Sequence, residues 1–231
     1  MVKPSGALKA KQRGSSSFSL ETHLVDALRR QLRKLLEETP YGDQFKVFTG
    51  VPVGAIIPDL MVVRLPFGSR VISNRKCQVP WLDGFVLSTL LNSESLSENE
   101  IADRLFLRQT LVGPSLRRLK RANLVVQDVG GFRLGLGQFP LDAQIVAIEA
   151  KLTRWKDAIE QAVAYLDFAN QSYVALPDDV VKSIPRISKR CEDAGVGLIS
   201  VGNGSVCIEK QAKFRAIYTP GWSWVMLRAV L

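Results

Sequence analysis

The sequence predicts an α/β fold into which a smaller unit of helices and a hairpin is inserted. Three observations predict it. From about residue 141 onward, strand-like apolar segments alternate with helix-like segments, which is typical of α/β proteins. Residues 144–150 form a nearly continuous apolar run, which predicts a strand buried on both faces of a sheet. Residues 81–137 show the order helix, helix, helix, hairpin and separate the two parts of the predicted core, 18–80 and 138–231.

The amino-terminal part of the chain is predicted to contain a basic arm, a helix and two strands. Residues 1–17 contain lysine and arginine but no acid, and they are rich in serine and glycine. They predict a disordered basic arm, which either contacts phosphates or only keeps the chain soluble. Leucines at helical spacing then predict a helix over 20–36. Strands are expected over 46–48 and 55–63, and a turn-rich stretch follows the second strand.

The carboxy-terminal part of the core is expected to alternate strands and helices. The predicted elements are a strand over 144–150, a helix over 154–169, a strand over 172–176, an interrupted helix over 180–194, and short strands over 197–201 and 205–208. The last apolar segment, 223–230, is expected to be an edge strand.

The inserted unit has its own signals. Helices are predicted over 82–91, 97–105 and 109–122, and Ser97 with Glu100 forms the pattern of a capping box. Two short strands around Gly130 and Gly131 then predict a hairpin. This order is that of a winged helix-turn-helix, whose third helix enters the major groove of DNA.

The third helix of this unit is strongly basic and contains no acid. Its cations would contact phosphates, and its polar side chains would contact base edges. The candidate nucleic-acid-binding residues are Arg108, Gln109, Thr110, Ser115, Arg117, Arg118, Lys120 and Arg121, with Arg133 in the hairpin. The alternative is a solvated basic helix in a unit that binds proteins.

Composition narrows the function classes. In 231 residues, 46% are hydrophobic and 23% charged, which excludes wholesale disorder and collagen-like repeats. Lys and Arg total 31 against 22 acids, a formal net charge of +9. This balance favours a polyanionic partner, most often nucleic acid, although a basic surface can also serve solubility alone.

Cysteine, histidine and hydropathy exclude other classes. Cys77, Cys191 and Cys207 form no CxxC pair, and His23 is the single histidine, so neither a disulfide framework nor a thiolate zinc site is indicated. No apolar run reaches the ~18–20 residues that span a bilayer, so no membrane partner is expected. We therefore expect an intracellular, cytoplasmic and nucleoid-associated protein.

Three residues in the core segments suggest chemistry. Residues i and i+2 of a strand point to one face, so Glu149 and Lys151 are expected to project together. Asp59, from a neighbouring strand, would be a second carboxylate. Two carboxylates can hold a hard cation such as Mg²⁺, while the lysine holds a water and offsets charge on a phosphoryl group.

These residues also carry a family resemblance. The segments Ile57-Pro58-Asp59-Leu60 and Ile148-Glu149-Ala150-Lys151 resemble the motif of the PD-(D/E)XK nuclease superfamily. Gln161 and Tyr165 on the following helix are similar to the Gln-x-x-x-Tyr pattern of its recombination-exonuclease branch. Glu21 lies on the opening helix, where several branches place another acid.

The resemblance implies a restriction-endonuclease-like core, a mixed central sheet flanked by helices. It implies Mg²⁺ or Mn²⁺ held by Asp59, Glu149 and the carbonyl of Ala150, with Gln161 steadying Lys151 or a phosphate. Family members commonly have one short hairpin between the two carboxylates, whereas here the inserted unit occupies that position. Arg154 and Lys156, just after the motif, would hold the substrate backbone, or they only begin a solvated helix.

The function expected from these observations is a metal-dependent DNA endonuclease, directed to duplex or branched DNA by the winged helix and acting alone, as a homodimer or with a partner protein. The alternative is a non-catalytic DNA-binding regulator, or a targeting subunit of a defence or transposition complex. Metal-dependent turnover distinguishes the two.

Overall fold

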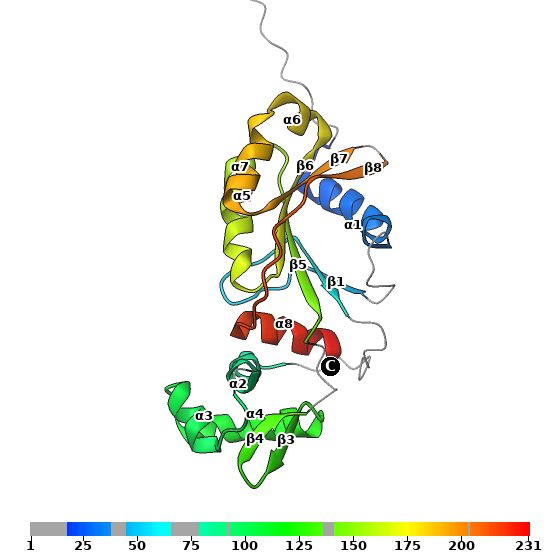
Figure 1. The fold of residues 1–231 in the computed structure, drawn as a ribbon. Helices are drawn as coiled ribbons and strands as arrows, with labels where there is room; N and C mark the ends of the chain where they lie inside the picture. Colours follow the sequence, from blue (N-terminus) through cyan, green and yellow to red (C-terminus); the bar gives the residue numbers. More distant parts are fainter. Residues whose placement is uncertain (1–17, 38–44, 66–78, 92, 136–140, 203) are drawn as a thin grey trace, which may run out of the picture.

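The protein is an α/β structure built on a mixed six-stranded sheet with helices on both faces, as the sequence predicts (Figure 1). The computed structural model describes residues 18–37, 45–65, 79–91, 93–135, 141–202 and 204–231. The expected basic arm, the turn-rich stretch and Cys77 lie outside the described residues. Within the described part of the chain, no helix has the length and apolarity needed to cross a bilayer.

The strand order of the sheet is β1-β2-β5-β6-β7-β8. Strands β5, β6 and β7 are parallel, and the remaining neighbours pair antiparallel. Both β5 and β6 are buried along their whole length, which explains the unbroken apolar run in the sequence. The strands are β1 (Phe45–Thr49), β2 (Leu60–Arg64), β5 (Gln144–Ala150), β6 (Gln171–Pro177), β7 (Gly197–Gly202) and β8 (Ser205–Lys210).

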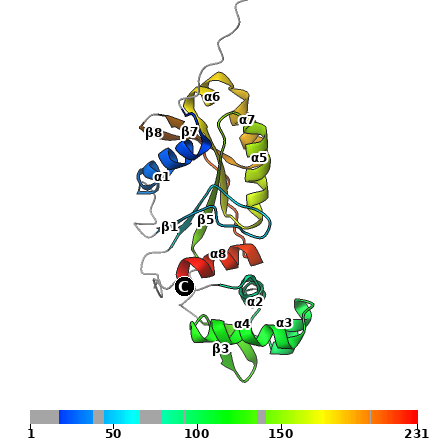
Figure 2. The same ribbon diagram turned by 180° about the vertical axis from the view of Figure 1, so that it is seen from behind.

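Helices cover the two faces of the sheet (Figures 1 and 2). On one face, Leu24, Leu28 and Leu32 form the buried stripe of α1 (Glu21–Glu37) against the sheet. On the other face lie α5 (Trp155–Ala164), the 3₁₀ turn η1 (Tyr165–Asp167), α7 (Arg186–Ala194) and α8 (Pro220–Val230). The short helix α6 (Asp178–Ser183) follows β6 directly.

Strand β2 begins later than the sequence predicts. Val53 and Ile56 hydrogen-bond to each other through both backbone N–H groups, and Gly54 between them has a φ of +63°. This tight turn needs the left-handed conformation that glycine adopts readily. The chain therefore extends only from Leu60, and Asp59 stands immediately before the strand.

The inserted unit has the predicted elements, and the capping box of Ser97 and Glu100 is present. Its helices are α2 (Trp81–Leu91), α3 (Glu98–Arg104) and α4 (Gln109–Arg121), and its hairpin strands are β3 (Val125–Asp128) and β4 (Gly131–Leu134). All five elements lie between β2 and β5 in the chain, although β2 and β5 are neighbours in the sheet.

The last element corrects the sequence prediction. The segment expected to be an edge strand is helix α8, which begins at Pro220. The Thr219 hydroxyl accepts a hydrogen bond from the backbone N–H of Trp222 at 3.2 Å, and proline is favoured at the first helical position. The helix is apolar on nearly every side because it lies between the sheet and α2, so helical periodicity is hidden (Figure 2).

The inserted unit and the sheet share one continuous core. Buried side chains of β2, β5 and α8 belong to the same apolar cluster as those of α2, α3, α4 and β3, and α8 packs directly on α2 and β5. Gly84 of α2 allows α2 and α8 to approach each other closely. A Cβ at this position would lie 2.6 Å from the Cβ of Trp224 and 2.7 Å from the carbonyl oxygen of Pro220. The unit is therefore packed onto the core rather than tethered to it.

This packing predicts that Gly84→Ala lowers the free energy of unfolding by about 1–3 kcal/mol, because α2 and α8 must move apart. Gly130→Ala in the turn between β3 and β4 is the control, since its Cβ would make only ordinary contacts, the nearest with Oδ1 of Asp128 at 3.4 Å. Alanine restricts the unfolded chain more than glycine does, so the control should be as stable as the parent or slightly more so. Urea unfolding measures both, and a Gly84→Ala protein of parental stability contradicts the account.

Candidate functional site

The fold brings Asp59 and Glu149 together. The antiparallel pairing of β2 and β5 places Leu60 opposite Ile148, so the residue before Leu60 stands beside the residue after Ile148. The backbone N–H of Ala150 donates a hydrogen bond of 2.8 Å to Oδ2 of Asp59. The two carboxylates therefore occupy one end of adjacent strands, despite the inserted unit between them in the chain.

Glu149 is the centre of the site. It is only 2% exposed, and both of its carboxylate oxygens accept hydrogen bonds. The Lys151 ammonium donates to Oε1, and the Tyr165 hydroxyl donates to Oε2. The same hydroxyl lies 3.4 Å from the carbonyl oxygen of Ile57, in the segment that leads to Asp59. Tyr165 therefore joins the turn after α5 to both carboxylate-bearing segments.

Burial and mutual repulsion set the protonation of the site. Burial raises the pKa of Glu149, and the hydrogen bonds from Lys151 and Tyr165 oppose this shift. Burial also raises the pKa of Asp59, against the Ala150 N–H and the charge of Lys151. Burial acts to lower the pKa of Lys151, but the hydrogen bond and charge of Glu149 outweigh it, so that pKa is raised. Lys151 is therefore an ammonium near neutral pH.

Of two further predicted residues, Glu21 lies close to this centre and Gln161 does not contact it. Glu21 begins α1 on the opposite face of the sheet, and its Oε2 is 3.8 Å from Nζ of Lys151. The structure thus brings a third acid to the lysine. Gln161 has an exposed side chain on α5, and among the described residues no hydrogen bond joins it to Lys151 or Glu149.

The donor set suits a magnesium ion. Asp59 and Glu149 offer carboxylate oxygens, the ligands that Mg²⁺ prefers, and burial raises the pKa of both. Within the described residues, no three histidine, cysteine or acidic side chains lie close enough to hold a metal alone. Mg²⁺ usually takes one or two carboxylates and completes its shell with water and phosphate oxygens, which fits two carboxylates.

The basic helix α4 corrects the prediction for Ser115 and gives Arg118 a partner within the inserted unit. Ser115 is fully buried and lies 3.0 Å from Nη2 of Arg118, so it is not available to a nucleic acid. Arg118 donates two hydrogen bonds, of 2.9 and 2.6 Å, to the buried carboxylate of Asp83 in α2. Ser115 lies on the side of α4 that carries Leu116 and Leu119 into the core, whereas the Arg118 side chain remains partly exposed. The missed signal was Asp83, an acid within an apolar helix.

The remaining predicted contacts are on the surface. Lys120 donates to Gln127 at 3.0 Å, and Arg133 is paired with Asp128 at 2.8 Å. Arg154 is paired with Asp157 at 3.3 Å. Arg108, Gln109, Thr110, Arg117 and Arg121 are also exposed, and none of them has such a pairing with another residue in the described part of the chain.

Comparison of the chain with protein-family models, with curated proteins and with solved structures found no match. The geometry of Asp59, Glu149, Lys151 and Tyr165 is therefore what indicates the function.

The Tyr165 hydrogen bond gives a pH-dependent prediction. The pKa of Glu149 is raised in the folded state, and Tyr165→Phe removes a donor that lowers it. Below the ordinary pKa of a glutamate, the protonated carboxyl does not need this donor. As pH rises through the folded pKa, the carboxylate forms, and the variant should lose about 1.5–3 kcal/mol relative to the parent.

Thermal or urea unfolding between pH 4 and 8, in EDTA, measures this difference. Tyr173→Phe is the control, because Tyr173 is also buried but its hydroxyl is near Gln171 and does not contact Glu149. A stability difference for Tyr165→Phe that stays constant with pH would show that the hydroxyl does not act on the carboxylate.

Proposed function

We propose that this chain is a Mg²⁺-dependent nuclease that hydrolyses phosphodiester bonds of DNA, with a restriction-endonuclease-like core of the PD-(D/E)XK type. One observation carries the proposal. Asp59, Glu149 and Lys151 meet at the end of two adjacent strands although the whole inserted unit separates Asp59 from the other two in the chain. This arrangement agrees with the order and strand context of the motif.

Each residue of the site has its own role in the proposed reaction. Asp59 and Glu149 bind Mg²⁺ or Mn²⁺, which supplies Lewis-acid polarisation of a phosphate oxygen and of a bound water. Tyr165 holds the Glu149 carboxylate in position. Because Lys151 keeps its proton, it donates hydrogen bonds to the attacking water or to the phosphoryl oxygens and offsets the charge that develops there. It is not the base.

The inserted unit supplies the targeting in this proposal. Its order of three helices and a hairpin is that of a winged helix, and α4 is the recognition helix. Arg108, Arg117 and Arg121 would contact phosphates, and Gln109 and Thr110 would reach base edges. Arg118 is not assigned a DNA contact, because its pairing with Asp83 orients α4 on α2.

The binding unit and the carboxylates lie at opposite ends of β5. Asn170 accepts from the Ile145 N–H and from the Trp222 indole of α8, on which the inserted unit packs. Glu149 lies four residues further along the strand, about 13 Å away. DNA held by α4 would therefore be cut at a position displaced from the contacts that select it.

One observation favours the alternative of a non-catalytic DNA-binding regulator. Both carboxylate oxygens of Glu149 already have protein partners, so the buried network is also complete as a purely structural feature. The two functions differ in metal-dependent turnover and not in DNA binding.

We predict that Asp59→Asn, Glu149→Gln and Lys151→Met each reduce cleavage of supercoiled DNA about 100-fold or more, because each removes a metal ligand or the charge at the phosphoryl group. Glu209→Gln is the control, since Glu209 is an exposed acid of β8 bonded to Ser200. The assay compares Mg²⁺, Mn²⁺ and EDTA on plasmid DNA.

The same preparations report metal binding independently, since Mg²⁺ should raise the unfolding temperature of the parent but not of Asp59→Asn. Cleavage by Glu149→Gln at the parental rate contradicts the nuclease. Tight DNA binding without cleavage in either metal would favour the regulator.

The recognition helix makes a separate prediction. Reversing charge at Arg117 and Arg121 should weaken binding to a short labelled duplex and reduce the slope of log affinity against log salt by about 0.9 per lost phosphate contact. Fluorescence anisotropy between about 50 and 200 mM salt measures both. Arg29→Glu with Arg30→Glu, on exposed positions of α1, is the charge-matched control. Equal losses in the two pairs would show that net charge, not α4, governs binding.

A further inference from the structure

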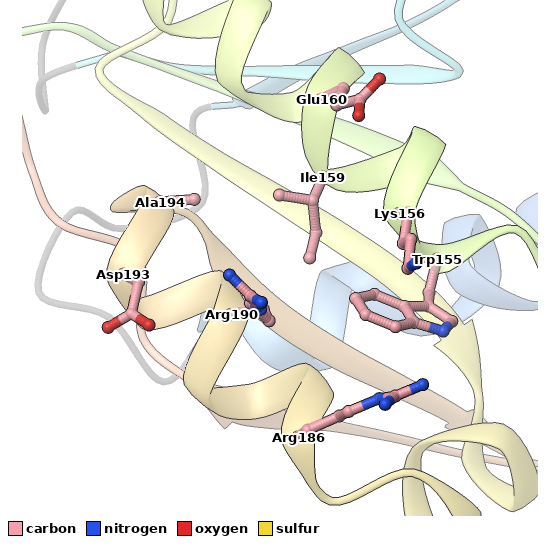
Figure 3. A pocket seen from close by; sticks show the side chains of 8 residues that line it. All are labelled: Trp155, Lys156, Ile159, Glu160, Arg186, Arg190, Asp193 and Ala194. Atoms are coloured by element: carbon pink, nitrogen blue, oxygen red, sulfur yellow. The ribbon is translucent and has the colours of Figure 1, made fainter.

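A groove lies between α5 and α7, outside the site described above (Figure 3). Its volume is about 570 Å³, and its walls combine an indole, three cations and a short apolar floor. The lining residues are Trp155, Lys156, Ile159, Glu160, Arg186, Arg190, Asp193 and Ala194.

The groove begins close to the candidate active site. Strands β5 and β6 are parallel, and the chain enters α5 just beyond the carboxyl end of β5, where Lys151 stands. Trp155 follows Lys151 by four residues, so their Cα atoms are at most about 14 Å apart. Helix α7 returns beside α5 after β6, and the groove runs between the two helices.

Trp155 offers an aromatic surface surrounded by positive charge. The Lys156 ammonium and the Arg186 guanidinium each lie 5.7 Å from the centre of its ring. Both distances fall within the about 6 Å of a cation–π contact, so the two cations lie over the indole, and a base that stacks on Trp155 must displace at least one of them. An aromatic ring beside arginine and lysine is the arrangement on which unpaired bases stack while their phosphates are neutralised.

The charges along the groove are unevenly distributed. Trp155, Lys156 and Arg186 form the end near Lys151, and Arg190 lies one turn further along α7. The acids Glu160 and Asp193 lie toward the other end, where Asp193 is paired with Lys189 at 2.9 Å. A polyanion is therefore attracted to the end of the groove that holds Trp155, Lys156, Arg186 and Arg190.

We propose that this groove binds an unpaired strand of the substrate, with one base stacked on Trp155 and phosphates contacted by Lys156, Arg186 and Arg190. The inference rests on the proposed nuclease function and specifies its substrate class. The preferred substrate is DNA with a single-stranded segment next to the scissile phosphate, such as a flap or a branch, in place of a continuous duplex.

The binding experiment uses the full chain in EDTA, so that no cleavage occurs. Anisotropy measures the affinity for a fluorescein-labelled oligothymidylate. Trp155→Leu and the double variant Arg186→Ala/Arg190→Ala should each weaken binding about tenfold or more. Arg29→Ala/Arg30→Ala removes the same charge from exposed positions of α1 and should bind like the parent. The arginine pair is exposed, so it tests the groove even if Trp155→Leu, which touches the core, fails to fold.

Parental affinity in the arginine pair, or an equal loss in the α1 control, overturns the groove assignment. Binding of a free mononucleotide as tight as that of the oligonucleotide also overturns it, because no strand is then needed. A second arm compares cleavage of flapped and fully paired duplexes in Mg²⁺. Cleavage with no effect of the groove variants on strand binding leaves the nuclease standing and rejects the groove. If the groove variants weaken strand binding but no DNA is cleaved, the groove assignment stands and the nuclease is rejected.

Discussion

The buried carboxylate of Glu149 is the constraint on which the candidate site depends. An ionised glutamate at 2% exposure is tolerated only with partners, because an unpaired buried charge costs several kcal/mol. Lys151 and Tyr165 supply those partners, and they come from the same strand end and from the turn after α5. The path of the chain around β5 is therefore set by one side chain as well as by apolar packing.

The inserted unit is accommodated because it leaves the sheet register unchanged. Strands β2 and β5 pair without interruption, and the inserted unit between them packs through α2 onto α8, the last helix of the chain. Gly84 lets these helices approach closely, so the unit extends the main core. Such packing fixes the proposed DNA-binding helix relative to the carboxylates, which a flexible tether does not do.

Local signals in the sequence were sufficient to predict most of the helices and strands. The alternation of strands and helices, the leucine stripe of α1 and the capping box at Ser97 depend on neighbours a few residues apart, and each prediction agrees with the structure. Helix α8 was misassigned because a helix buried on nearly all sides loses its periodic pattern. Its Thr219-Pro220 cap was the remaining local signal.

The sequence by itself determined the α/β class, the elements of the inserted unit and the shared face of Glu149 and Lys151, because strand and helix periods are local properties. Only the tertiary structure decided that Asp59 lies beside Glu149, since pairing of distant strands depends on the whole sheet. It also decided that Ser115 is buried and that Arg118 is paired with Asp83, whereas Arg117 stays exposed. The groove at Trp155 likewise exists only because parallel strands bring α5 and α7 side by side.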